Sequence, residues 1–158
     1  GTNVNEIKNR YNAAAKEINN KFSGSEQAAK AAYDAAAKSA NNVYEQGLKQ
    51  ADSALEAAKK SAQEWLDQCM KQPPYNQCKA TFDSKVQSAL KSHSVTVINL
   101  KSALASALSK AQKARDAAIQ SAKDARDMAL KNANDTRDKA LSLESDRAAK
   151  ALDKCRAQ

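Results

Sequence analysis

The chain has 158 residues, of which 34 are Ala and only 22 are Leu, Ile, Val or Phe, and its net charge is +8. Ala, Glu, Lys, Leu and Arg together make up about half of the residues, a composition typical of long helices and coiled coils. Three Gly and two Pro are too few for the many turns of a β-sandwich, a barrel or an α/β enzyme. The composition therefore predicts an all-α protein with a thin core.

The first predicted helix spans about residues 2–71 and follows an 11-residue (hendecad) repeat. Six units run from Thr2 without an insertion. Eleven residues make three turns at 3.67 residues per turn, so an apolar stripe stays on one side of the helix with little supercoiling. The tenth place holds Tyr11, Phe22, Tyr33, Tyr44, Leu55 and Leu66, and the sixth holds Ile7, Ile18, Ala29, Ala40, Ala51 and Ala62.

A turn is expected at residues 72–76, because Pro73 pushes Gln72 out of the helical region of backbone space. The second predicted helix spans about residues 77–156 and repeats with the same period from Cys78. Its ninth place holds Val86, Val97, Leu108, Ile119, Leu130, Leu141 and Leu152.

Two long helices joined by a short connection form an antiparallel hairpin. We therefore expect one domain over residues 1–158. In such a pair the numbers of facing residues have a constant sum, and a sum of 148 places the ninth-place residues of the second helix on the sixth-place residues of the first. Large residues then mostly meet Ala, which lets the helices approach closely. Dimerisation of the hairpin would give a four-helix rod.

The same sum places Arg side chains of the second helix on aromatic rings of the first. A guanidinium over a ring contributes about 0.5–1 kcal/mol at an exposed site. The alternative is that these Arg side chains reach Asp or water. The three expected pairs are Arg115 on Tyr33, Arg126 on Phe22 and Arg137 on Tyr11.

Cys69 and Cys78 flank the turn, and we expect a disulfide between them because no second pair of ligands completes a zinc site. Cys155 faces no residue of this chain at a sum of 148, so we expect its partner in a segment absent here or in another molecule. His93 is the only His and has no adjacent Cys or acidic cluster. The sequence predicts no enzymatic activity, no cofactor and no metal site.

The cysteines and their surroundings resemble those of the TsetseEP domain, over about residues 60–158. This is an insect family of secreted, helical, gut-associated proteins without an assigned biochemical activity. The resemblance implies secretion, here into an insect gut lumen, and no catalytic residues to transfer. Family members carry a further Cys near their start, which this chain lacks, so the pairing of Cys155 stays open. The matching pattern is Trp65-Leu66, Cys69, then Cys78-Lys79-Ala80, and a long helix ending in Cys155.

We expect a secreted, non-enzymatic structural or interaction protein that acts through an extended helical surface. In a secreted protein, Asn134 would be a candidate for N-glycosylation. The first expected partner is a second copy, and an acidic polymer or surface is a further candidate. Nucleic acid is disfavoured, because the basic residues are interleaved with acidic ones. Pairing at a sum of 148 leaves a second Ala stripe uncovered: Ala14, Ala36, Ala58, Ala103, Ala114 and Ala125.

The alternative function is reversible binding to lipid or to another apolar interface. An amphipathic helix with an 11-residue period is compatible with a membrane surface, but an apolar face made mostly of Ala buries little area in a bilayer.

Overall fold

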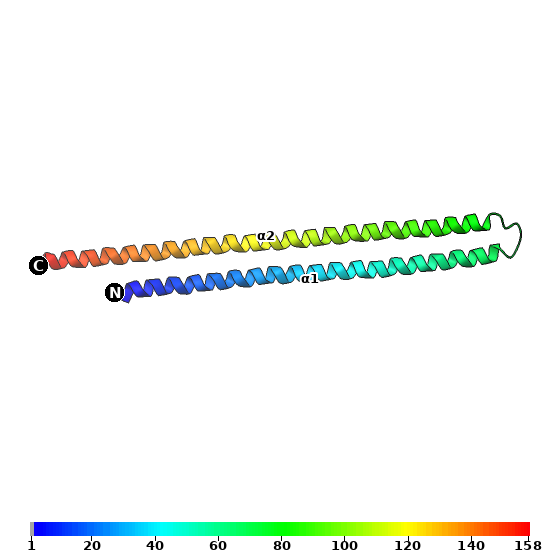
Figure 1. Ribbon diagram of the computed structural model, residues 1–158. Coiled ribbons are helices and arrows are strands. Elements are labelled where there is room, and N and C mark those ends of the chain that lie inside the picture. Colours follow the sequence, from blue (N-terminus) through cyan, green and yellow to red (C-terminus); the bar gives the residue numbers. More distant parts are fainter. Residues whose placement is uncertain (1) are drawn as a thin grey trace. The chain divides into compact units, whose positions relative to one another are not determined.

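A computed structural model describes residues 2–158, and it consists of two long helices, α1 (Thr2–Cys69) and α2 (Cys78–Arg156). They form a helical hairpin (Figure 1), and residues 2–158 contain no strand. The predicted all-α hairpin is confirmed. Its basis in an 11-residue repeat stays a prediction.

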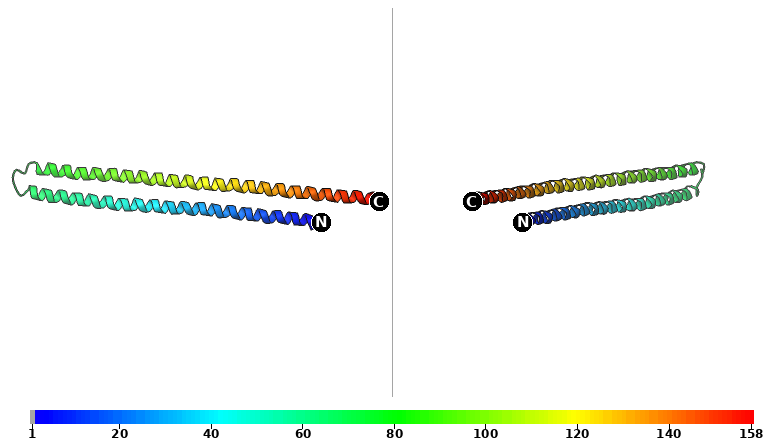
Figure 2. Two further views of the ribbon diagram at one scale, coloured as in Figure 1. Left: turned by 180° about the vertical axis from the view of Figure 1, so that it is seen from behind. Right: turned by 60° about the vertical axis from the view of Figure 1, so that its left-hand side comes forward.

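The chain divides into two compact units, and each unit contains one segment of α1 and one segment of α2. Unit 1 comprises Gly1–Ala32 and Lys113–Gln158, and unit 2 comprises Tyr33–Gln112, including the turn. Within each unit the α1 and α2 segments run antiparallel and side by side, as both views in Figure 2 show. The single domain over residues 1–158 stays a prediction, and each unit is described by itself below.

The connection between the helices is longer than the sequence indicates. Helix α1 ends at Cys69 rather than near residue 71, and α2 begins at Cys78 rather than residue 77. A helical N–H at position 73 would bond to the Cys69 carbonyl oxygen, but Pro73 has no N–H. Pro74 likewise has no N–H to donate to the Met70 carbonyl oxygen. The carbonyl oxygens of Cys69 and Met70 therefore lose their helical hydrogen bonds, and the helix ends at Cys69.

A disulfide joins Cys69 to Cys78 across this turn, with the two Cα atoms 5.8 Å apart. The Cys78 N–H donates to the Tyr75 carbonyl oxygen at 3.0 Å, which closes a last turn before α2 begins. Cys78 is almost completely buried. In the chain-entropy model a bridge over so short a loop stabilises the fold by about 2–3 kcal/mol.

The core is a line of small residues on α1 against larger residues on α2. In unit 2 it includes buried Ala51 and Ala62, with Val97 and Val86 half-buried at the facing positions. In unit 1 Ala29 is buried and Ile119 is half-buried. No charged or polar residue is buried among those described. The pattern agrees with a register in which facing residue numbers sum to about 148.

Two glycines in α1 differ sharply in their surroundings. A Cβ atom added at Gly47 would lie 2.6 Å from Leu100 Cδ2 and 3.4 Å from its Cγ, whereas one added at Gly24 would meet nothing within 4 Å. Gly47 therefore marks a place in unit 2 where α2 packs directly on the α1 backbone.

Replacement of each glycine by Ala tests this close approach. Gly24→Ala should raise the free energy of unfolding by about 0.5–1 kcal/mol, because Ala is the better helix former and nothing obstructs it. Gly47→Ala should lose that gain, or become destabilising, because Leu100 must move aside. Urea unfolding of both variants measures the difference. An equal gain in the two variants would contradict the packing described for Gly47.

Candidate interaction surface

Two Arg side chains of α2 lie over aromatic rings of α1 in unit 1. The guanidinium carbon of Arg126 is 4.3 Å from the centre of the Phe22 ring, and that of Arg137 is 4.3 Å from the centre of the Tyr11 ring. Both pairs have residue numbers that sum to 148. The third expected pair, Arg115 and Tyr33, belongs to two different units, and its pairing stays a prediction.

Each of these Arg side chains also contacts the Asp that follows it. The Nε atom of Arg126 donates to Asp127 Oδ1 at 3.1 Å, and that of Arg137 donates to Asp138 Oδ1 at 3.2 Å. Arg115 makes the same contact with Asp116 at 3.3 Å. An Arg side chain can thus contact the ring and the Asp at the same time, because the guanidinium presents its face to the ring and its Nε edge to the carboxylate.

Polar contacts between the helices include two that sequence reasoning missed. In unit 2, His93 Nε2 and Asp52 Oδ1 form a hydrogen bond of 2.8 Å. In unit 1, Asn3 donates to Glu144 at 3.2 Å. The residue numbers sum to 145 for His93 and Asp52 and to 147 for Asn3 and Glu144. Both sums lie within one helical turn of 148, so a search for polar partners close to the facing position could have found both pairs.

Trp65 lies near the disulfide in unit 2. The ammonium nitrogen of Lys85 on α2 is 5.3 Å from the centre of its ring. This cation–π contact holds the Lys stem against the apolar end of the helix pair.

A shallow groove runs between α1 and α2 on one side of unit 2. Two sections of about 620 and 530 Å³ share Ala58, Lys85 and Ser88, so they are continuous. Small residues line the groove on both helices: Gly47, Ala54 and Ala58 on α1, and Ser88, Ser92 and Thr96 on α2. The pattern of residues in the sequence did not predict this groove.

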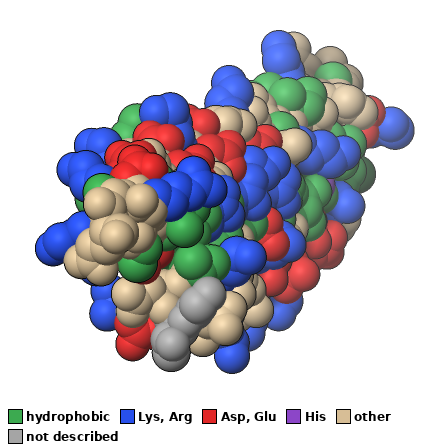
Figure 3. Space-filling model, turned by 90° about the vertical axis from the view of Figure 1, so that its left-hand side faces the viewer, with side chains coloured by type: hydrophobic (Ala, Val, Ile, Leu, Met, Phe, Trp, Pro, Cys, Tyr) green, Lys and Arg blue, Asp and Glu red, His purple; other side chains and the backbone are tan. Residues whose placement is uncertain are grey.

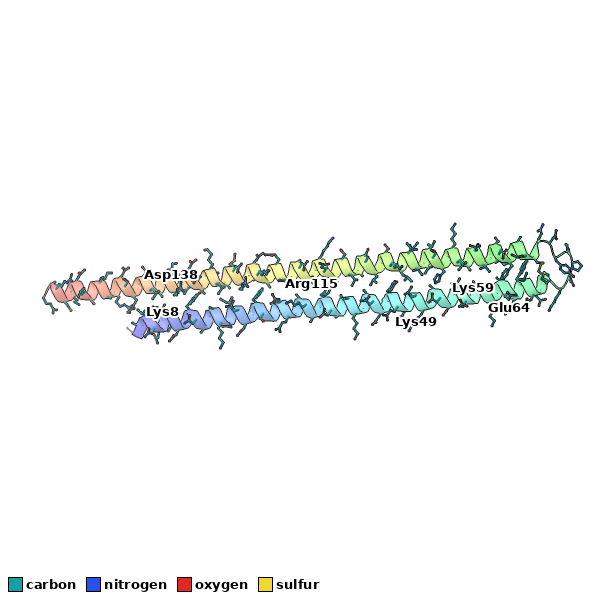
Figure 4. All side chains as sticks on the ribbon, viewed as in Figure 1. Lys8, Lys49, Lys59, Glu64, Arg115 and Asp138 are labelled. Carbon is teal, nitrogen blue, oxygen red and sulfur yellow. A yellow bond between two sulfur atoms is a disulfide. The ribbon has the colours of Figure 1, made fainter. Side chains whose placement is uncertain are left out.

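The remaining charged side chains are spread over both helices. The charged residues labelled in Figure 4 lie on both helices. In the space-filling view, Lys and Arg lie beside Asp and Glu, with hydrophobic side chains reaching the surface between them (Figure 3). Ion pairs such as Lys79–Asp83 at 2.9 Å and Lys131–Asp135 at 3.4 Å join neighbouring turns of one helix. Exposed pairs of this kind contribute little to stability.

The other candidate residues lie apart from one another. Cys155 is a free, exposed thiol near the end of α2. Asn134 is half-buried within α2. Over residues 2–158, no three His, Cys, Asp or Glu side chains are grouped as a metal site would need. Neither described helix has a segment apolar enough to span a bilayer.

Comparison of the chain with protein-family models, with curated proteins and with solved structures found no match. The resemblance to the TsetseEP domain therefore rests on the cysteine pattern alone and stays a prediction.

The contact of Arg126 with Phe22 can be measured by a double-mutant cycle. Arg126→Gln and Phe22→Leu should show a coupling of about 0.5–1 kcal/mol in the free energy of unfolding. Arg147→Gln serves as the control, because that guanidinium is mostly exposed and lies 3.7 Å from Glu144 rather than on a ring. Combined with Phe22→Leu, it should show no coupling. Additive effects of Arg126→Gln and Phe22→Leu would mean that the stacked geometry contributes nothing.

Proposed function

We propose that this protein is a secreted, non-enzymatic structural or interaction protein that acts through the surface of its helices and associates with copies of itself. The observation that carries the proposal is its large exposed surface. The chain exposes 11759 Å², whereas a folded monomer of 17.0 kDa exposes about 7700 Å². Each chain thus exposes roughly 4000 Å² beyond the usual value, and obligate homodimers bury about 1000–2500 Å² per partner.

The thin core supports the same proposal. The buried hydrophobic residues among those described are three Ala and one Cys, each of which buries little area. Ordering the backbone costs about 1–2 kcal/mol per residue, so long helices need more apolar contact than one such line supplies. Contact with a second copy would add it.

Candidate surfaces for that contact remain uncovered within a single chain. Of the second Ala stripe expected from the sequence, only Ala14 is half-buried. Ala36, Ala58, Ala103, Ala114 and Ala125 are exposed. A four-helix assembly would bury such stripes by close helix packing.

An acidic polymer or surface is the second candidate partner, and one feature of unit 2 favours it. Residues 84–112 of α2 contain no Asp or Glu but four Lys side chains. Lys91 lies four residues before the exposed Val95, and Lys101 lies three residues after the exposed Ile98. A basic stretch of this kind attracts anionic partners, most strongly at low ionic strength.

Secretion is supported by the Cys69–Cys78 disulfide, since such bonds persist mainly in oxidising compartments.

Static light scattering across a concentration series tests self-association. We expect the weight-average mass to rise from the monomer value of 17.0 kDa to at least twice that value as the protein is concentrated from about 1 µM to 1 mM. The measurement should use the Cys155→Ser variant, which excludes a disulfide between chains without a reductant that would also open the Cys69–Cys78 bridge. A monomer mass over the whole range would contradict self-association and leave the basic stretch of α2 as the favoured interaction surface.

A further inference from the structure

The groove of unit 2 differs from the rest of the molecule in its charge. It is lined by 19 residues, which include one Lys and one His but no Asp or Glu. Asp, Glu, Lys and Arg make up 28% of the chain, so about five would be expected among 19 residues. Depletion of charged residues distinguishes the core of protein interfaces from other surface.

Ala51 and Ala62 at the floor of the groove are buried, but most of the lining is exposed although it carries little charge. Ala54 and Ala58 on α1 and Ser88, Ser92 and Thr96 on α2 are all exposed to solvent. Val43, one turn before Gly47 on the same face of α1, is 64% exposed. Short side chains on both walls would let the backbone of another helix approach closely.

We infer that this groove is the face through which two copies of the chain associate. The inference rests on the self-association proposed above and names the surface that carries it. With a net charge of +8 on each chain, two copies repel each other overall, and a contact face with few charges adds least to that repulsion. The groove face has the fewest charges to bring together, because its lining includes a single Lys, Lys85, and no Asp or Glu.

The surface area of each chain is large enough for a second copy to be the occupant. A two-fold pairing buries the same face on both chains, and each chain has surface well beyond what such a dimer covers. The α1 and α2 walls of one groove would then pack on those of the other, as four helices do in a bundle.

A charge placed in the groove tests the inference. Ala54→Glu and Ser92→Glu each put a carboxylate at an exposed groove position, one on each wall, where the helix itself tolerates it. In sedimentation equilibrium, we expect each to raise the dimer dissociation constant by roughly tenfold or more, because an unpaired charge is desolvated at the interface. Ala105→Glu is the matched control, since Ala105 is exposed on α2 but does not line the groove.

A charge swap identifies the occupant. A mixture of the Ala54→Glu and Ala54→Lys variants should associate more tightly than either variant alone, because a mixed dimer has one charge of each sign in its interface, whereas each unmixed dimer has two like charges. Circular dichroism at 222 nm checks that every variant keeps its helicity.

The possible outcomes separate the inference from the proposed function. If the unmodified chain stays monomeric, both fail. If it associates and the groove variants associate as tightly as the Ala105→Glu control, self-association stands but the groove is not its interface. If the groove variants dissociate but the mixture does not recover, the groove does not pair with the same groove of a second copy, and the inference is overturned.

Discussion

Two helices packed against each other can bury only one stripe each, and in this chain the α1 stripe consists mostly of small residues. Ala29, Ala51 and Ala62 are the positions on α1 that become buried, and larger residues of α2 lie half-buried opposite them. Small side chains on one helix allow the close approach seen at Gly47 and Leu100. They also limit the apolar area that the pair can remove from water. Close packing and a thin core thus have the same cause.

The two units supplement this thin contact in different ways. Along α2, one position of the 11-residue pattern holds Phe82, His93 and Leu104 in unit 2 but Arg115, Arg126 and Arg137 in unit 1. In unit 1, Arg126 and Arg137 each combine a ring of α1 with the neighbouring Asp. Unit 2 instead has the disulfide, the His93–Asp52 hydrogen bond and the Lys85–Trp65 contact. Its interhelical groove stays almost free of charge, which makes unit 2 the better candidate for association.

Much of this fold could be predicted from the sequence, because its determinants are local or periodic. Gln72-Pro73-Pro74 marks the reversal, and the spacing of apolar residues predicts a register that agrees with the burial of Ala29, Ala51 and Ala62. The exact end of α1 was missed by two residues, since it depends on which carbonyls lose their partners to Pro73 and Pro74. The groove was also missed. A register gives the facing pairs, but it does not tell where a continuous groove is left between the helices, because that depends on the size of the side chains flanking the contact on both helices.

We propose that contact with a second copy supplies stability that one helix pair lacks. Thermal unfolding followed by circular dichroism tests it most directly, with protein concentration varied about a hundredfold at fixed pH and salt. If folding is coupled to association, the Tm must rise with concentration, because the folded state is favoured by mass action. We expect a rise of several degrees over this range. A Tm that is the same at every concentration would contradict the account and show that the helix pair is stable by itself.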